Sequence, residues 1–267
     1  MRTLCAIVVS SALALAVAPV AGDTYYFTAA VDSSWHNEDN WKDACTSGGD
    51  GQVPTSTDNA VICEGKLCTI STADAECLGL TVQADADLTV GTSKTLQIGA
   101  NSTITGDLSF ASDGELHIAG SLTLSGGDSI PFAAGGEIEF QGDYNLVLAN
   151  GTTLSGGFLM NRSSGSYTFV NNGKVEATEG LDVTFRNGTI QSGGQGAYPT
   201  VFKVSHADST MEFDSTCTVS NMGGDFEVTA GTLRIETDTC TTGDLTFSGG
   251  KIQVTANKVF QAGGTCN

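Results

Sequence analysis

The sequence predicts an all-β fold, a right-handed single-stranded parallel β-helix (β-solenoid) of about seven coils with three short strands in each. Three observations predict it. Short apolar-x-apolar triplets recur from about residue 78 onward, no helical period is sustained, and the triplets form sets that repeat along the chain. Alternation with period two is typical of strands with one buried face, and a repeat of three such strands is typical of solenoids.

The triplets define the predicted coils, which we place in residues 78–267. The sets begin at Leu80/Val82, Leu108/Phe110, Ile138/Phe140, Tyr167/Phe169, Phe202/Val204, Phe226/Val228 and Ile252/Val254. The steps between them fall in the range of solenoid repeats, and the longest step contains the Gly-rich insertion 192–196. An antiparallel sandwich is the rival fold. We favour the solenoid because the repeat regains its register after the insertion and because two-residue hairpin turns are not the rule.

Residues 1–22 have the layout of a cleavable signal peptide. Met1-Arg2 gives a positive start, the residues up to Val20 are nearly all apolar or small, and Ala21-Gly22 precede the first acidic residue. The apolar run is too short for a typical membrane-spanning helix, although a retained anchor is the alternative. We therefore expect a secreted chain, extracellular or at the cell surface, with no membrane span after cleavage.

The charge balance limits the partners. The chain has 11 Lys and Arg against 30 Asp and Glu, a formal net charge of −19. A field of that sign opposes nucleic acid, so we expect no nucleic-acid partner. It is compatible with weak, nonspecific Ca²⁺ binding, but no Ca²⁺-binding nonapeptide recurs.

The cysteines are consistent with export. Cys5 lies in the signal segment, and the seven disulfide candidates are Cys45, Cys63, Cys68, Cys77, Cys217, Cys240 and Cys266. An oxidising compartment would let most of them pair, and the absence of CxxC and Cys/His groupings argues against structural zinc. The last three are spaced by nearly the length of the predicted coil, and each follows a Thr. We expect them to stack on successive coils, with one bridge between two of them.

Four Asn-x-Ser/Thr triplets are candidate glycosylation sites. Their asparagines are Asn101, Asn150, Asn161 and Asn187. Each would accept a glycan if the host is eukaryotic. Turns rich in Asn, Gly, Ser and Thr also produce such triplets by chance, and the sequence does not separate the two.

A distinctive block opens the mature chain. It reads Trp35-His36-Asn37-Glu38-Asp39-Asn40-Trp41, then Gly51-Gln52-Val53-Pro54, then Asp58-Asn59-Ala60-Val61-Ile62. This block resembles the opening of secreted right-handed parallel β-helix proteins of the adhesin and autotransporter-passenger-like, cell-surface type. The resemblance covers roughly the first third of the chain by motif. It implies export and a surface role, and it carries over no catalytic residue.

We expect residues 23–77 to form a disulfide-bonded cap, because the end of a solenoid exposes an apolar cross-section and strand edges. Trp35 and Trp41 would supply the apolar cover, and a bridge such as Cys68–Cys77 would fix the segment. The alternative for the two indoles is a sugar-stacking platform. No cap is evident at the other end, so end-to-end self-association through the C-terminal coil is a further expectation.

The sequence offers little chemistry. Three pairs of acids share one side of a predicted strand, Glu137/Glu139, Asp225/Glu227 and Glu236/Asp238, but no basic residue adjoins them. His36, His117 and His206 show neither triad nor metal-ligand spacing. We predict no catalytic, cofactor-binding or metal-binding residue.

The function that we expect is a non-catalytic structural or adhesive module, with extracellular polysaccharide or a cell-surface component as the partner. The main alternative is a polysaccharide-active enzyme, a lyase or glycoside hydrolase of the pectate-lyase-like β-helix type. A further alternative is ice binding, which needs a face of stacked Thr, whereas the outward residues here are mixed.

Overall fold

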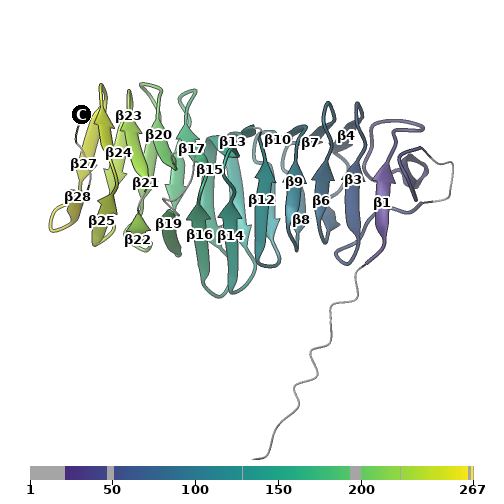
Figure 1. The fold of residues 1–267 in the computed structure, drawn as a ribbon, viewed down its shortest axis with the longest axis horizontal. Coiled ribbons are helices and arrows are strands. Elements are labelled where there is room, and N and C mark those ends of the chain that lie inside the picture. The colour runs from purple at the N-terminus through teal and green to yellow at the C-terminus, as the bar shows by residue number, and fades with distance from the viewer. Residues whose placement is uncertain are drawn as a thin grey trace, which may run out of the picture.

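The computed structural model of the chain is a rod in which short strands stack side by side along one axis (Figure 1). It describes residues 22–46, 51–127, 129–192, 200–222, 224–263 and 266. Residues 1–21 of the expected signal peptide and most of the Gly-rich insertion therefore lie outside the described residues. Within them, the strands pair in parallel except for β1 and β2, and no helix is long and apolar enough to cross a membrane.

Three ladders of strands form the sides of the rod. The first contains, in spatial order, β2 (Trp41–Lys42), β1 (Thr24–Phe27), β3 (Asn59–Ile62), β6 (Leu80–Val82), β9 (Ser102–Ile104), β12 (Leu122–Gly126), β14 (Tyr144–Leu148), β16 (Tyr167–Asn171), β19 (Thr189–Ser192) and β22 (Thr218–Met222). The second contains β4 (Leu67–Ile70), β7 (Asp87–Val90), β10 (Asp107–Phe110), β13 (Ser129–Phe140), β15 (Thr153–Arg162), β17 (Lys174–Ala177), β20 (Val201–Val204), β23 (Asp225–Val228) and β26 (Leu245–Phe247). The third contains β5 (Ala75–Cys77), β8 (Thr95–Ile98), β11 (Glu115–Ile118), the second halves of β13 and β15, then β18 (Val183–Phe185), β21 (Thr210–Phe213), β24 (Thr232–Ile235) and β27 (Lys251–Val254). Finally, β25 (Thr239–Thr242) pairs with β28 (Val259–Ala262), and the one short 3-10 helix of the described chain is η1 (Glu38–Asn40).

Each turn takes one strand from each ladder, and there are about nine turns rather than the seven predicted. The solenoid prediction is confirmed, but its repeat length is wrong over most of the rod. Leu108 pairs with Leu88 rather than with Leu80, so the true step there is shorter than the predicted one. The predicted step from Phe202 to Phe226 is confirmed, because these two residues pair on adjacent turns. The predicted step joined Leu80 in the first ladder to Leu108 in the second, so it compared two different sides of the rod.

The interior is filled by the apolar member of each alternating pair. Aromatic side chains stack on successive turns, with ring centroids 4.3 Å apart for Phe110 and Phe132 and 4.9 Å apart for Phe185 and Phe213. Parallel strands about 4.8 Å apart bring equivalent side chains to this distance. Burial of these rows provides most of the stabilisation, because each turn would expose its apolar side if it were alone.

The strands β13 and β15 continue through a corner of the rod and join the second and third ladders. At Gly156 the backbone has φ +96°, and a Cβ there would lie 1.9 Å from the carbonyl oxygen of Phe132. Only glycine fits both the positive φ and the close approach. The corner therefore depends on this residue.

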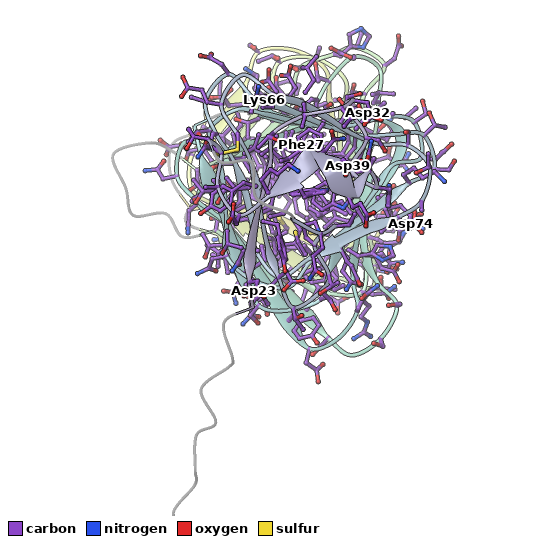
Figure 2. All side chains as sticks on the ribbon, turned by 90° about the vertical axis from the view of Figure 1, so that its right-hand side faces the viewer. Asp23, Phe27, Asp32, Asp39, Lys66 and Asp74 are labelled. Carbon is purple, nitrogen blue, oxygen red and sulfur yellow. A yellow bond between two sulfur atoms is a disulfide. The ribbon has the colours of Figure 1, made fainter. Side chains whose placement is uncertain are left out.

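The N-terminal end of the rod is covered by the segment around β1 and β2. Viewed from that end, Phe27 lies near the middle of the cross-section, with Asp32 and Asp74 toward its rim (Figure 2). Trp35 and Trp41 are fully buried, and their rings meet edge-on with centroids 4.8 Å apart. Neither indole presents a ring face to solvent, so no aromatic surface for a sugar exists at these positions.

A buried amide fixes this cap. The Oδ1 atom of Asn40 accepts hydrogen bonds from the backbone N–H groups of Val31 and Asp32, and its Nδ2 donates to Asp32 Oδ1 at 2.7 Å. Parallel pairing already begins where Thr24 faces Asn59. The coils thus start inside the segment that the sequence assigned wholly to a cap.

One disulfide joins two of the seven candidate cysteines. Cys45 and Cys63 are bonded, with their Cα atoms 5.8 Å apart. Cys68 and Cys77 are buried free thiols, so the expected Cys68–Cys77 bridge is wrong. The reason is topological, because Cys68 points inward from the second ladder and Cys77 from the third. Burial raises the pKa of Cys77 to about 12, and such a thiol is unreactive near neutral pH.

The expected stack of three late cysteines is also wrong. Cys217, Cys240 and Cys266 are free, and only the first two are buried. On the following turn Cys240 faces Phe260, whereas Cys266 lies beside Leu245 of the second ladder. The similar spacing of the three residues therefore does not place them in one column.

Candidate functional site

A groove follows the outer side of the second ladder near the N-terminal end, and we call it the Thr69 groove. Its volume is about 700 Å³. Polar and apolar side chains share its surface, and seven of the lining residues carry a hydroxyl or carboxyl group. The lining residues are Ser33, Leu67, Cys68, Thr69, Asp87, Thr89, Asp107, Leu108, Ser109, Ser129 and Pro131. Backbone hydrogen bonds that join Thr69 to Ser33 and Trp35 hold the cap against its first turn.

The hydroxyl row of the groove arises from the alternation of the triplets. In β4, β7 and β10 the second and fourth residues point inward, and the residue between them points outward. Leu67, at the start of β4, is exposed. The register pairs Thr69 with Thr89 and Thr89 with Ser109. Three hydroxyl groups therefore follow one another at about the 4.8 Å spacing of strands, and the last two are 3.3 Å apart.

A carboxyl pair forms the second row of the groove. Asp87 and Asp107 face each other on adjacent turns. Partial desolvation raises the pKa of Asp87, and a hydrogen bond to Asp107 together with the charge of Asp107 raises it further. The two carboxyl groups are in direct contact. Glycosidases separate their two carboxyl groups by about 5 Å or more, so this pair lacks that arrangement.

The third ladder carries a cluster of different composition, the His117 cluster, which consists of Glu115, His117 and Glu139. Glu115 and His117 are two residues apart on β11, and Glu139 faces His117 from β13. The Nε2 atom of His117 lies 2.9 Å from Glu115 Oε2 and 3.1 Å from Glu139 Oε2. All three side chains are partly buried.

The surroundings of His117 complete this cluster. The Nδ1 atom of the imidazole lies 2.7 Å from Nε2 of Gln141. On the other side, His117 borders a hollow of about 190 Å³ that is also lined by Glu76, Thr95 and Gln97. The imidazole therefore has a fixed orientation and an open approach from solvent.

Negative charge is concentrated around the cluster. Glu137 pairs with Glu115 across the turns and lies two residues before Glu139. Burial raises the pKa of Glu137, the charges of Glu139 and Glu115 raise it further, and His117 acts in the opposite direction. A cation bound at this side of the rod would relieve that repulsion.

A second acidic cluster lies farther along the third ladder, but two of its three carboxylates are already paired with arginines. Its carboxylates belong to Glu212, Asp214 and Glu236. Arg234 lies 3.5 Å from Glu212, and Arg186 lies 3.4 Å from Asp214. These guanidinium groups occupy the place of a cation.

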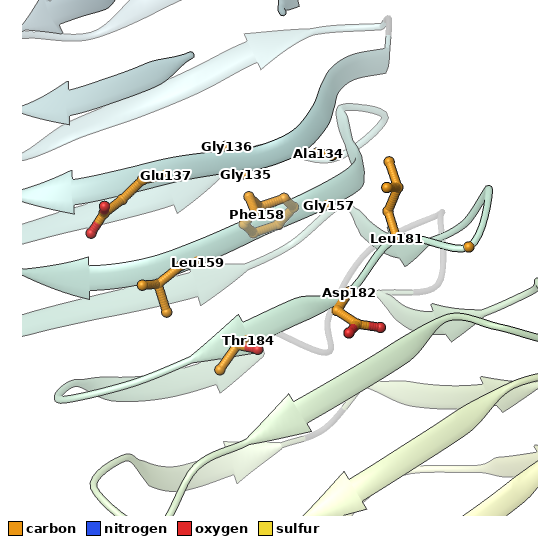
Figure 3. Close-up of a pocket in the computed structure, with 11 residues that line it drawn as sticks. Ala134, Gly135, Gly136, Glu137, Gly157, Phe158, Leu159, Leu181, Asp182 and Thr184 are labelled. Atoms are coloured by element: carbon orange, nitrogen blue, oxygen red, sulfur yellow. The ribbon is translucent and has the colours of Figure 1, made fainter. Parts of the chain in front are cut away.

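The corner between the second and third ladders has a hollow of about 470 Å³ (Figure 3). Gly135, Gly136, Gly157 and Gly180 form part of its wall, and Leu159 and Leu181 are among its apolar lining residues. Asp182 at its edge already accepts a hydrogen bond from the backbone of Thr210 at 2.7 Å. The hollow exists because the corner requires small residues. Within the residues that the structure describes, its lining contains no histidine or cysteine that could act as a metal ligand or nucleophile.

The candidate glycosylation sites fall into two classes. Asn101 and Asn150 are exposed near turns. Asn161 and Asn187 are partly covered, and Asn187 Nδ2 donates a hydrogen bond of 2.8 Å to Asn161 Oδ1. A glycan is attached through Nδ2, so attachment at Asn187 would use the nitrogen that makes this contact. The exposed pair is therefore the more accessible.

Sequence reasoning missed both the Thr69 groove and the His117 cluster. It identified Glu137/Glu139 as acids on one side of a strand and His117 as a histidine without metal-ligand spacing, but it did not place them side by side. The signal was present as Glu115-x-His117 followed, one strand pair later, by Glu137-x-Glu139. This signal can be recognised only when the true number of residues per turn is known.

Comparison of the chain with protein-family models, with curated proteins and with solved structures found no match.

Proposed function

We propose that the chain is a secreted extracellular or cell-surface module with a structural or adhesive role, and that it binds a neutral polysaccharide along the Thr69 groove. The observation that carries the proposal is the register of Thr69, Thr89 and Ser109, which presents one hydroxyl per turn beside the Asp87–Asp107 pair. Such a repeating row of donors and acceptors suits a ligand that is itself a repeating row of hydroxyl groups. The charge of −19 disfavours acidic polysaccharides.

Two further features support an extracellular role. The N-terminal block resembles the opening of adhesin-type β-helix proteins, and residues 1–22 have the composition of a secretory signal. The Cys45–Cys63 disulfide is of the kind that persists in oxidising compartments.

The test is a glycan array followed by titration calorimetry with the neutral oligosaccharide that binds best. Thr89→Val removes one hydroxyl of the groove at constant shape, and loss of one hydrogen bond should weaken binding about three- to tenfold. Thr184→Val is the matched control, because Thr184 also points outward but from the third ladder. Absence of binding to any glycan, or equal loss in the two variants, would contradict the proposal.

The alternative is a polysaccharide-active enzyme, and the same protein can test it. Incubation with neutral and acidic polysaccharides should release no new reducing ends and no unsaturated products. Sustained product release that Asp87→Asn abolishes would replace the binding role with a catalytic one.

Self-association through the last turn is a further part of the proposal. Among the described residues, Phe247, Val254 and Val259 of β26, β27 and β28 are 43%, 39% and 51% exposed. A second copy that covers this turn would bury those side chains. Light scattering should show concentration-dependent dimers that Val259→Lys reduces, and a concentration-independent monomer would contradict this part.

A further inference from the structure

The His117 cluster differs from an ordinary group of surface acids because its centre is an imidazole nitrogen. Two carboxylate oxygens, one from Glu115 and one from Glu139, lie at 2.9 and 3.1 Å from His117 Nε2. The ligand atoms of all three residues lie within 4.8 Å of one another. The donors come from two adjacent turns, β11 and β13.

These distances match the edges of a coordination polyhedron. Imidazole nitrogen and carboxylate oxygen bind a first-row divalent ion at about 2.1 Å. Two ligands at right angles around such an ion are therefore about 3.0 Å apart, and tetrahedral ligands are about 3.4 Å apart. An ion could enter the space between the three atoms with only small movements of the side chains.

We propose that Glu115, His117 and Glu139 form a binding site for a divalent transition-metal ion of the Zn²⁺ or Mn²⁺ type. A mixed nitrogen and oxygen donor set favours such ions over Ca²⁺, which takes six to eight oxygen ligands. The three protein ligands leave at least one position open to water, as in sites that exchange their outer ligands. The adjoining hollow beside Gln97 and Thr95 gives that position access to solvent.

Gln141 supplies the outer contact that such a site requires. Its side-chain amide lies 2.7 Å from His117 Nδ1. With the amide oxygen toward Nδ1, the imidazole would carry its proton on Nδ1 and would leave Nε2 free to bind the ion.

The cluster of Glu212, Asp214 and Glu236 shows why the composition matters. That cluster has three carboxylates but no imidazole, and Arg186 and Arg234 contact two of its members. At the His117 cluster, the described structure shows no arginine or lysine contact to Glu115 or Glu139. The charge of these two carboxylates, without a lysine or arginine partner in the described part of the chain, favours a cation there.

The experiment is calorimetric titration of Zn²⁺, Mn²⁺ and Ca²⁺ into full-length mature protein that has been treated with a chelator. We expect one saturable Zn²⁺ equivalent and weaker Ca²⁺ binding. His117→Gln and Glu139→Gln should each weaken Zn²⁺ binding at least tenfold. His206→Gln is the matched control, because His206 is an exposed histidine of the same rod and lies outside the cluster.

Co²⁺ provides a readout of the ligands themselves. The visible absorption of the Co²⁺-loaded protein should change in His117→Gln and not in His206→Gln. Circular dichroism checks that both variants fold, which is expected because both side chains point outward. Absence of a stoichiometric site, equal loss in the two His variants, or Ca²⁺ binding as tight as Zn²⁺ would each overturn the assignment. In the first case the cluster is an ion-pair network alone.

Discussion

Replacement of Phe213 by alanine tests whether the rod is stabilised turn by turn. Phe213 is fully buried, and its ring lies 4.9 Å from that of Phe185 and 5.6 Å from those of Phe202 and Phe226. Truncation of a buried Phe costs about 3–5 kcal/mol, and each aromatic pair adds about 0.5–1.5 kcal/mol beyond its buried area. With three partners, we expect the upper part of that range, about 4–5 kcal/mol.

The effect of this substitution should also be local. In a solenoid each turn contacts only its neighbours, so a cavity at β21 weakens the interfaces with β18 and β24 first. Urea unfolding measures the total loss, and hydrogen exchange by mass spectrometry locates it. Phe213→Leu, which keeps most of the volume, should lose less than half as much. A loss below about 1 kcal/mol, or an equal increase in exchange in β6 and β9, would refute the reasoning.

Three other outcomes follow from the geometry. Gly156→Ala should destabilise the protein by more than about 2 kcal/mol in thermal unfolding, because φ is +96° and the new Cβ meets a carbonyl oxygen. The control Gly65→Ala, at positive φ but with nothing within 4 Å of the new Cβ, should cost about 1 kcal/mol. The pKa of Asp87 is higher in the folded chain than in the unfolded chain, so the folded chain holds this proton more tightly. The contribution of Asp87 to stability should therefore fall as the pH rises above about 4 and through the raised pKa. Asp87→Asn should remove that component from unfolding curves measured at different pH values. Reduction of the Cys45–Cys63 bridge, which closes a loop with a sequence separation of 18, should lower the free energy of unfolding by about 3 kcal/mol, and alkylation before and after reduction should differ by two thiols.

The alternation of apolar residues was sufficient to predict the strands and their inward sides. Leu116 and Ile118 point into the rod and His117 points outward, because successive side chains of a strand alternate between faces. Parallel stacking also followed from the repetition. These features depend on residues that are close together in the chain, so a single sequence is enough to predict them.

The register could not be predicted in the same way, because the three ladders use the same kind of triplet. Leu80, Leu88 and Leu96 look alike in sequence, yet they lie in the first, second and third ladders. The corners that separate them are single turn residues, such as Asp85 with φ +57° and Ser93 with φ +52°. Neither residue type marks a corner uniquely, so an error of one strand in the repeat goes unnoticed.

That error concealed the His117 cluster. With the predicted repeat, the neighbour of His117 on the next turn would be Asn145, Leu146 or Val147, and no second carboxylate would face it. The true register brings Glu139 opposite His117. A step that is wrong by a single residue already turns the side chain to the other face. A ligand site that spans two turns of a solenoid is therefore visible in the sequence only once the length of that turn is known to the residue.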